Sequence, residues 1–219
     1  MNGRGCKMAK TLWFLLKPAL VMVGIVTLLY PVLLLLCFAT GGSSLFFGYL
    51  QGFFVLYDVM IGICAAQAIS GYAPLALSFG TTRRSLRGAA FGFCLIIPLL
   101  CLGLDLLCSL VTTRLFYAEM NQLIAALTEY PLPGFGYKLL LCSAMLWLGT
   151  LDFSALPMAK RVGAILLIVV VYMQMMVFML LSSFLPHTVN FYGLVLGLLS
   201  LPFAALTLHR LKHFTITQV

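Results

Sequence analysis

Three aspartates lie inside apolar runs of the sequence: Asp58, Asp105 and Asp152. A charge at the middle of a bilayer costs about 2.5–3.5 kcal/mol on insertion scales, so such residues tend to face protein or water. Gln51 lies seven residues before Asp58, on nearly the same face of a helix. Asp152 is close enough in sequence to pair with Lys160 or Arg161. We expect these polar residues to line a polar path or to join helices by hydrogen bonds.

The segment Tyr72–Arg87, YAPLALSFGTTRRSLR, combines helix signals with basic residues. Pro74 suits the first turn of a helix, Gly80 the position just past a helix end, and Thr82 the cap of a following helix. The pattern predicts a short helix and then a break. Two interpretations stay open: a helix that docks into a groove of a soluble partner, or a positive loop that fixes topology and touches lipid headgroups. The residues available for such contact are Leu75, Leu77, Phe79, Gly80, Thr81, Thr82, Arg83, Arg84 and Arg87.

The sequence does not assemble a set of catalytic residues. The three histidines lie at or beyond the ends of apolar runs, and no hydrolase or metalloprotease motif is present. Cys94, Cys101 and Cys108 share one side of a helix, where thiolates could bind a soft metal. Without a histidine nearby, we expect them to pack helices instead. The chain also has no Gly-x-x-x-x-Gly-Lys-Ser/Thr phosphate loop, so we expect no catalytic, cofactor or metal site and no enzyme activity in it.

These residues must be positioned by membrane helices. Of the 219 residues, 63% are hydrophobic and 8% are charged, against about 25% charged in soluble domains. A spanning helix needs roughly 20 mostly apolar residues, and the first run is too long for a signal peptide. We predict an all-α protein in which residues 1–219 form a single transmembrane domain. The six predicted spans are 18–39, 45–69, 88–111, 137–157, 162–185 and 190–208.

Basic residues gather in alternate connections between the predicted spans. Lys and Arg favour cytoplasmic loops, and placing both termini in the cytoplasm puts 11 of the 13 inside. Those inside are Arg4, Lys7, Lys10, Lys17, Arg83, Arg84, Arg87, Lys160, Arg161, Arg210 and Lys212. Arg114 and Lys138 stay outside. Residues 6–16 are either a helix lying in the inner interface or a basic flank that orients the first span.

The predicted outer connection, residues 112–136, has apolar residues at helical spacing from Leu115 to Leu127. We expect a short amphipathic helix on the outer surface, ended by the Pro- and Gly-rich stretch 131–136. The helix would cap the ends of the spans or cover a transport path.

Three GxxxG pairs lie in the predicted spans: Gly48 with Gly52, Gly88 with Gly92, and Gly193 with Gly197. Because small residues let helix backbones come close, each pair marks a position where two helices could cross tightly.

The phrase PLALSFGTTRRSLRG, between the second and third predicted spans, resembles the type 2 ABC-transporter permeases of bacteria. The six spans and internal termini resemble that family too. The resemblance implies a coupling helix at residues 73–82 that contacts a nucleotide-binding ATPase subunit, which would hold ATP and Mg²⁺. It also implies pairing with a second copy or a sister permease, location in the bacterial cytoplasmic membrane, and export of a peptide, lipid or small hydrophobic compound. One departure is the short 185–190 connection, since those exporters usually have re-entrant elements between spans five and six.

Other classes of function remain open from the sequence. A substrate-binding membrane subunit of a vitamin importer can also be a small six-span protein, but it would dock through small residues on helices. A non-transporting membrane partner or immunity protein is a further alternative. The formal net charge of +8 is explained by lipid contact and topology, so we expect no nucleic-acid partner.

Overall fold

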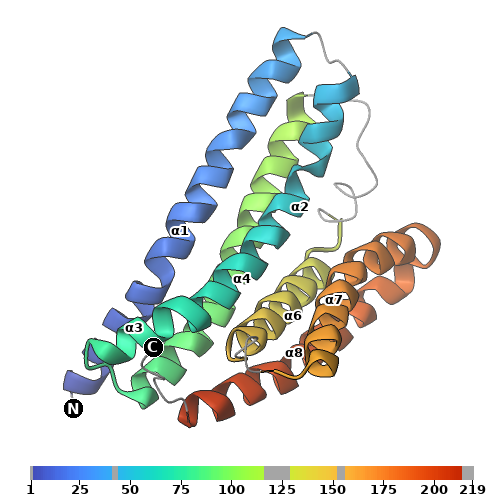
Figure 1. The fold of residues 1–219 in the computed structure, drawn as a ribbon. Helices are drawn as coiled ribbons and strands as arrows, with labels where there is room; N and C mark the ends of the chain where they lie inside the picture. The colour runs from blue at the N-terminus through green and yellow to red at the C-terminus, as the bar shows by residue number, and fades with distance from the viewer. Residues whose placement is uncertain (1, 41–43, 116–128, 152–155, 214–219) are drawn as a thin grey trace.

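A computed structural model describes residues 2–40, 44–115, 129–151 and 156–213 (Figure 1). These ranges are helical apart from short turns, and six helices are long and apolar enough to cross a membrane. In chain order the elements are α1 (Asn2–Ala39), α2 (Ser44–Gln67), the π-helical turn η1 (Ala68–Tyr72), α3 (Ala73–Ser78), α4 (Arg83–Leu115), α6 (Pro131–Gly149), α7 (Met158–Phe184) and α8 (Pro186–Lys212). The predicted all-α class with six candidate spans is confirmed.

Helix α6 is the central element of the bundle. It contacts α2, α4, α7 and α8, and it is the most buried of the six long helices. Helices α1, α2 and α4 pack on one another, while α7 and α8 lie on the other side of α6 (Figure 1). A polar side chain on the inner faces of α6 therefore has protein around it rather than lipid.

Helix α6, which contains most of the predicted 137–157 span, begins at Pro131 and ends at Gly149, so it starts and ends earlier than that span. Residues 131–136 form the first turns of α6, and the outer helix that they were expected to end lies outside the described residues. Pro131 lies in the first turn, where the amide that proline lacks would have no partner in the helix. Gly136 then lets α8 pass closely: a Cβ at Gly136 would collide with the carbonyl oxygen of Gly193.

Helix α1 runs unbroken for 38 residues, with Pro18 inside it. At 1.5 Å per residue it is about 57 Å long, well beyond the ~30 Å hydrocarbon core. Residues 6–16 continue the first span and do not form a separate helix, which favours the basic-flank interpretation. This part of α1 packs on α4, where a Cβ added at Gly92 would lie 3.2 Å from Leu12 Cδ1. The hydroxyl oxygens of Thr11 and Ser85 are 3.0 Å apart in the same contact.

The chain leaves α2 without a break, through the π-helical turn η1 and directly into α3. The helical run therefore continues past residue 69, where the second span was predicted to end. The predicted signals after it are confirmed: Pro74 is in the first turn of α3, and Gly80 has φ of 80°. The first residues of α1 and the last of α8 lie at the same end of the bundle as α3 (Figure 1).

Thr82 caps α4, as predicted, because its hydroxyl oxygen accepts a hydrogen bond from the Ser85 amide at 3.2 Å. Replacing Thr82 with alanine is expected to lower the free energy of unfolding by about 1 kcal/mol, the usual loss for such a cap. Thermal unfolding in detergent measures this, with Thr82→Ser as the matched control that keeps the acceptor. Equal midpoints for wild type and Thr82→Ala would contradict the capping role.

Candidate functional site

A buried ion cluster joins three helices at the centre of the bundle. Lys138 of α6 donates a hydrogen bond from Nζ to Asp58 Oδ1 of α2 at 2.5 Å. The same Nζ lies 2.6 Å from Asp105 Oδ2 of α4. All three side chains are at most 2% exposed. We call Asp58, Lys138 and Asp105 the charge cluster.

The helix pattern explains why these residues meet. Asp58 shares the buried face of α2 with Ile61 and Ala65, three and seven residues later. Asp105 lies between the buried Cys101 and Cys108 on the inner face of α4. Both faces pack on α6, and Lys138 therefore extends into the space between two carboxylates.

The cysteine spacing on α4 also corresponds to an inward face. Cys94, Cys101 and Cys108 are all buried, so the prediction that they line one side of the helix is confirmed. In the described part of the chain, no group of three His, Cys, Asp or Glu side chains could hold a metal ion.

The charge cluster is not electrically balanced by its own side chains. Two carboxylates and one ammonium carry a formal charge of −1, and all three groups are removed from water. The described residues give Asp105 Oδ1 no hydrogen-bond partner. Tyr172 of α7 reaches the cluster only through the backbone, its hydroxyl donating to the Asp58 carbonyl oxygen at 3.4 Å.

Lys138 is the residue that the sequence interpretation misplaced. We counted it among the outer basic residues, at the second position of the predicted 137–157 span, but its side chain is buried in α6 and 2% exposed. Its removal from the outer connections leaves Arg114 as the one basic residue assigned there. The sequence did contain a signal for a buried Lys138. This lysine adjoins the apolar run of α6, and two aspartates in other apolar runs each need a cation.

Other predicted polar residues are only partly placed by the structure. Gln51 lies in α2, but its side chain is outside the described part. Asp152 falls outside the described residues. The predicted amphipathic helix from Leu115 to Leu127 also falls outside them, except for Leu115, which is the last residue of α4. The predicted partner Arg161 donates from Nε to the Leu156 carbonyl oxygen at 2.8 Å.

A second candidate site lies at the end of the bundle, on α3 and the turn after it. Phe79 is 76% exposed and Leu75 is 47% exposed. Arg83 and Arg84 are exposed beside them at the start of α4. Leu77, predicted to share this surface, is instead half-buried against the core, and Arg87 is also half-buried. We call Leu75, Phe79, Arg83 and Arg84 the α3 surface.

A hollow of about 450 Å³ adjoins the α3 surface, between α1 and the turn that follows α3. Its lining is Lys10, Thr11, Phe14, Ala76, Phe79, Gly80, Thr81 and Thr82. The rings of Phe14 and Phe79 pack edge to face, with their centroids 6.3 Å apart. The hollow thus combines aromatic walls with the exposed ammonium of Lys10.

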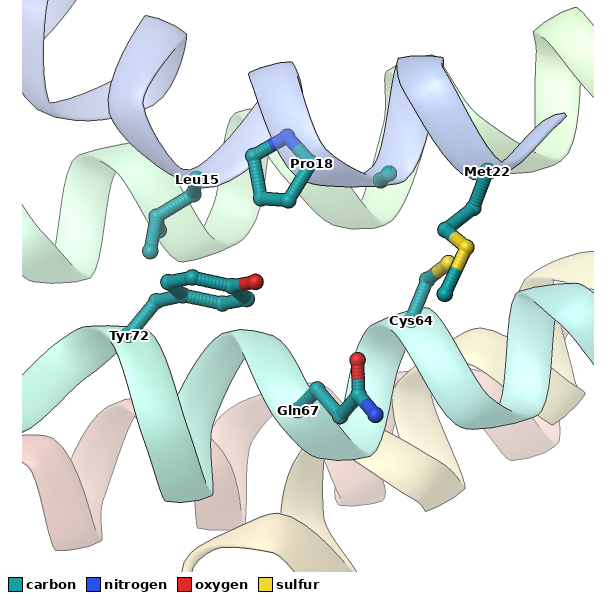
Figure 2. A pocket seen from close by; sticks show the side chains of 7 residues that line it. Leu15, Pro18, Met22, Cys64, Gln67 and Tyr72 are labelled. Carbon is teal, nitrogen blue, oxygen red and sulfur yellow. The ribbon is translucent and has the colours of Figure 1, made fainter. Parts of the chain in front are cut away.

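A small cavity separates α1 from α2 near the π-helical turn (Figure 2). Leu15, Pro18 and Met22 approach it from α1, while Cys64, Gln67 and Tyr72 face them from α2 and η1. Its volume is about 30 Å³, which suits a water molecule rather than a peptide or lipid.

No known protein family, curated protein or solved structure matches this chain.

Proposed function

We propose that the chain is the membrane permease subunit of an ATP-driven transporter, and that the α3 surface docks a separate ATPase subunit. The observation that carries this proposal is an exposed phenylalanine and leucine next to two exposed arginines, at one end of a membrane-spanning bundle. Arginines beside these apolar side chains favour the membrane surface over the hydrocarbon core. A partner protein gives the apolar side chains somewhere to be buried.

The chemistry of the α3 surface fits a helix that inserts into a groove. Such a helix buries a few apolar anchors, here Phe79 and Leu75, in a pocket of the partner. Arg83 and Arg84 suit carboxylates at the rim of that pocket, since guanidinium groups pair with them in a planar, bidentate geometry. The hollow beside Phe79 accepts a side chain of the partner in return.

The absence of a Gly-x-x-x-x-Gly-Lys-Ser/Thr loop from the sequence supports a separate ATPase subunit in this proposal. In this proposal ATP and Mg²⁺ bind to the partner subunit, and the chain pairs with a second copy or a sister permease. The transported compound would be a peptide, a lipid or a small hydrophobic molecule. The membrane would be the bacterial cytoplasmic membrane, with both termini and the α3 surface on the cytoplasmic side.

The first test is purification of the tagged full chain from its native membranes in a gentle detergent, followed by mass spectrometry. The expected result is an ATP-binding protein present in stoichiometric amount. A chain that purifies alone and tightly holds a small ligand would replace this proposal with the importer subunit. A chain that purifies alone and empty would favour the non-transporting partner.

Charge reversal on the α3 surface tests the docking assignment. Arg83→Glu together with Arg84→Glu is expected to lower ATPase recovery by about tenfold or more, because like charges now face the partner's carboxylates. The amount of inserted chain should not change. Lys160→Glu with Arg161→Glu is the matched control, because these are also two adjacent exposed basic residues in the first turn of a long helix, α7. Equal ATPase recovery with both double variants would contradict docking at the α3 surface.

A further inference from the structure

The charge cluster has no role in the docking proposed above, and its charges point to a ligand of its own. We propose that the charge cluster binds one exchangeable proton, held by the pair of carboxyl groups around Lys138. This inference does not rest on the proposed ATPase partner. It would hold equally for a permease, an importer subunit or any other protein built on this bundle.

The first argument is the charge count. Asp58, Lys138 and Asp105 carry a formal charge of −1 when all are ionised, and they are 1–2% exposed. A single uncompensated charge in an apolar interior has a very large desolvation cost, so such groups usually become neutral or bind a counterion. One proton on a carboxyl group brings the cluster to zero.

The second argument is the free position on Asp105. Its Oδ2 faces the ammonium at 2.6 Å, while Oδ1 is buried and has no hydrogen-bond partner among the described residues. A buried carboxylate oxygen without a donor is costly, because it has lost its water and gained nothing. A proton bound to this oxygen makes the carboxyl group neutral, which lowers the cost of burying it away from water.

The neighbouring titratable groups do not supply a second cation. The phenols and thiols placed around the cluster by α1, α2, α4, α6, α7 and α8 are neutral near pH 7. They are Tyr30, Tyr57, Cys64, Cys101, Cys108, Tyr137, Cys142, Tyr172 and Tyr192. Lys138 is the one cation among the described groups that interact with these carboxylates.

A proton fits this position better than a metal ion. Hard cations need about six oxygen ligands, whereas the cluster offers two carboxylates that already share an ammonium. The ammonium would also repel a metal cation placed beside it. A proton needs only one oxygen and adds no volume to a packed interior.

The proton links pH to the opening of the bundle. Water reaches the cluster only when α2, α4 and α6 move apart, since all three side chains are buried between these helices. Opening therefore permits release of the proton, and closing requires its return. Low pH would therefore favour the arrangement in which α2, α4 and α6 are packed together around the cluster.

Infrared spectroscopy of the full chain in lipid nanodiscs at neutral pH tests the proposal directly. The expected result is one carbonyl-stretch band from a protonated carboxylic acid, shifted in D₂O once the proton exchanges. Asp58→Asn and Asp105→Asn should each lose this band, because either variant keeps one carboxylate and one ammonium and is already neutral. Size-exclusion chromatography and circular dichroism establish that the variants are folded.

Asp152→Asn is the matched control, because it removes an acidic residue from another apolar run of the sequence. It should leave the band unchanged. Absence of the band in the wild type, its survival in both cluster variants, or its loss in Asp152→Asn would each overturn the proposal. A thermal midpoint that rises when sodium chloride replaces choline chloride would overturn it in favour of a metal cation.

Discussion

Replacing Lys138 with methionine is expected to prevent accumulation of the folded protein. Methionine keeps much of the length and flexibility of lysine, but it leaves the buried carboxyl groups of Asp58 and Asp105 without the cation that both contact. Breaking a buried ion pair from one side costs about 3–5 kcal/mol. That is a large share of the ~5–15 kcal/mol by which proteins are usually stable. The yield of monodisperse protein and its thermal midpoint in detergent measure the effect.

Neutralising the whole charge cluster should restore the fold. The triple variant Asp58→Asn, Lys138→Met, Asp105→Asn keeps side chains of similar size and removes every charge. Buried ion pairs replaced as a set are often neutral or stabilising, so the triple variant should regain most of the yield lost in Lys138→Met. If Lys138→Met alone were as stable as wild type, the three side chains would not form the cluster.

The second large effect is expected at the crossing of α6 and α8. A Cβ at Gly193 would lie 2.5 Å from Cα of Pro133, and one at Gly136 would collide with the Gly193 carbonyl oxygen. Backbone atoms cannot rotate away as side chains can. Gly136→Val is therefore expected to cost at least the ~1–3 kcal/mol typical of overpacking. Loss of the monodisperse peak and a lower thermal midpoint are the observable results.

Gly163→Val in α7 is the matched control, because nothing lies within 4 Å of a Cβ added there. Its stability should stay close to that of wild type. A Gly136→Val protein that unfolds at the same temperature as Gly163→Val would show that α6 and α8 do not cross as closely as described.

The all-α class and the candidate spans could be predicted from the sequence, because they depend on the length and composition of local runs. The turn before α4 could also be predicted from the sequence. Pro74, Gly80 and Thr82 each have a backbone or capping preference that needs no knowledge of the rest of the chain. The continuous helix from α2 into α3 was missed, because nothing in the local sequence distinguishes a π-helical turn from a break.

The charge cluster could be predicted only in part. Asp58 and Asp105 stood out because each interrupts an apolar run. Lys138 could not be recognised as their partner in the same way. It is 80 residues from Asp58 in the sequence, and contact between the two depends on how the helices pack. The rule that assigns basic residues to loops also worked against it. Lys138 follows prolines and glycines that usually end helices, yet here they begin one against α8.

The unbroken helical run from Ser44 to Ser78 has a mechanical consequence. Asp58 and Leu75 lie on this same run, separated by about 25 Å of helix at 1.5 Å per residue. A force that tilts one end of a stiff rod is transmitted to the other end, in the manner of a lever. The widened turn at Ala68–Tyr72 is the point of least regular hydrogen bonding along it. If α3 were displaced, this shared helix is the path by which Asp58 would move with it, and η1 is the place where the helix would bend most easily.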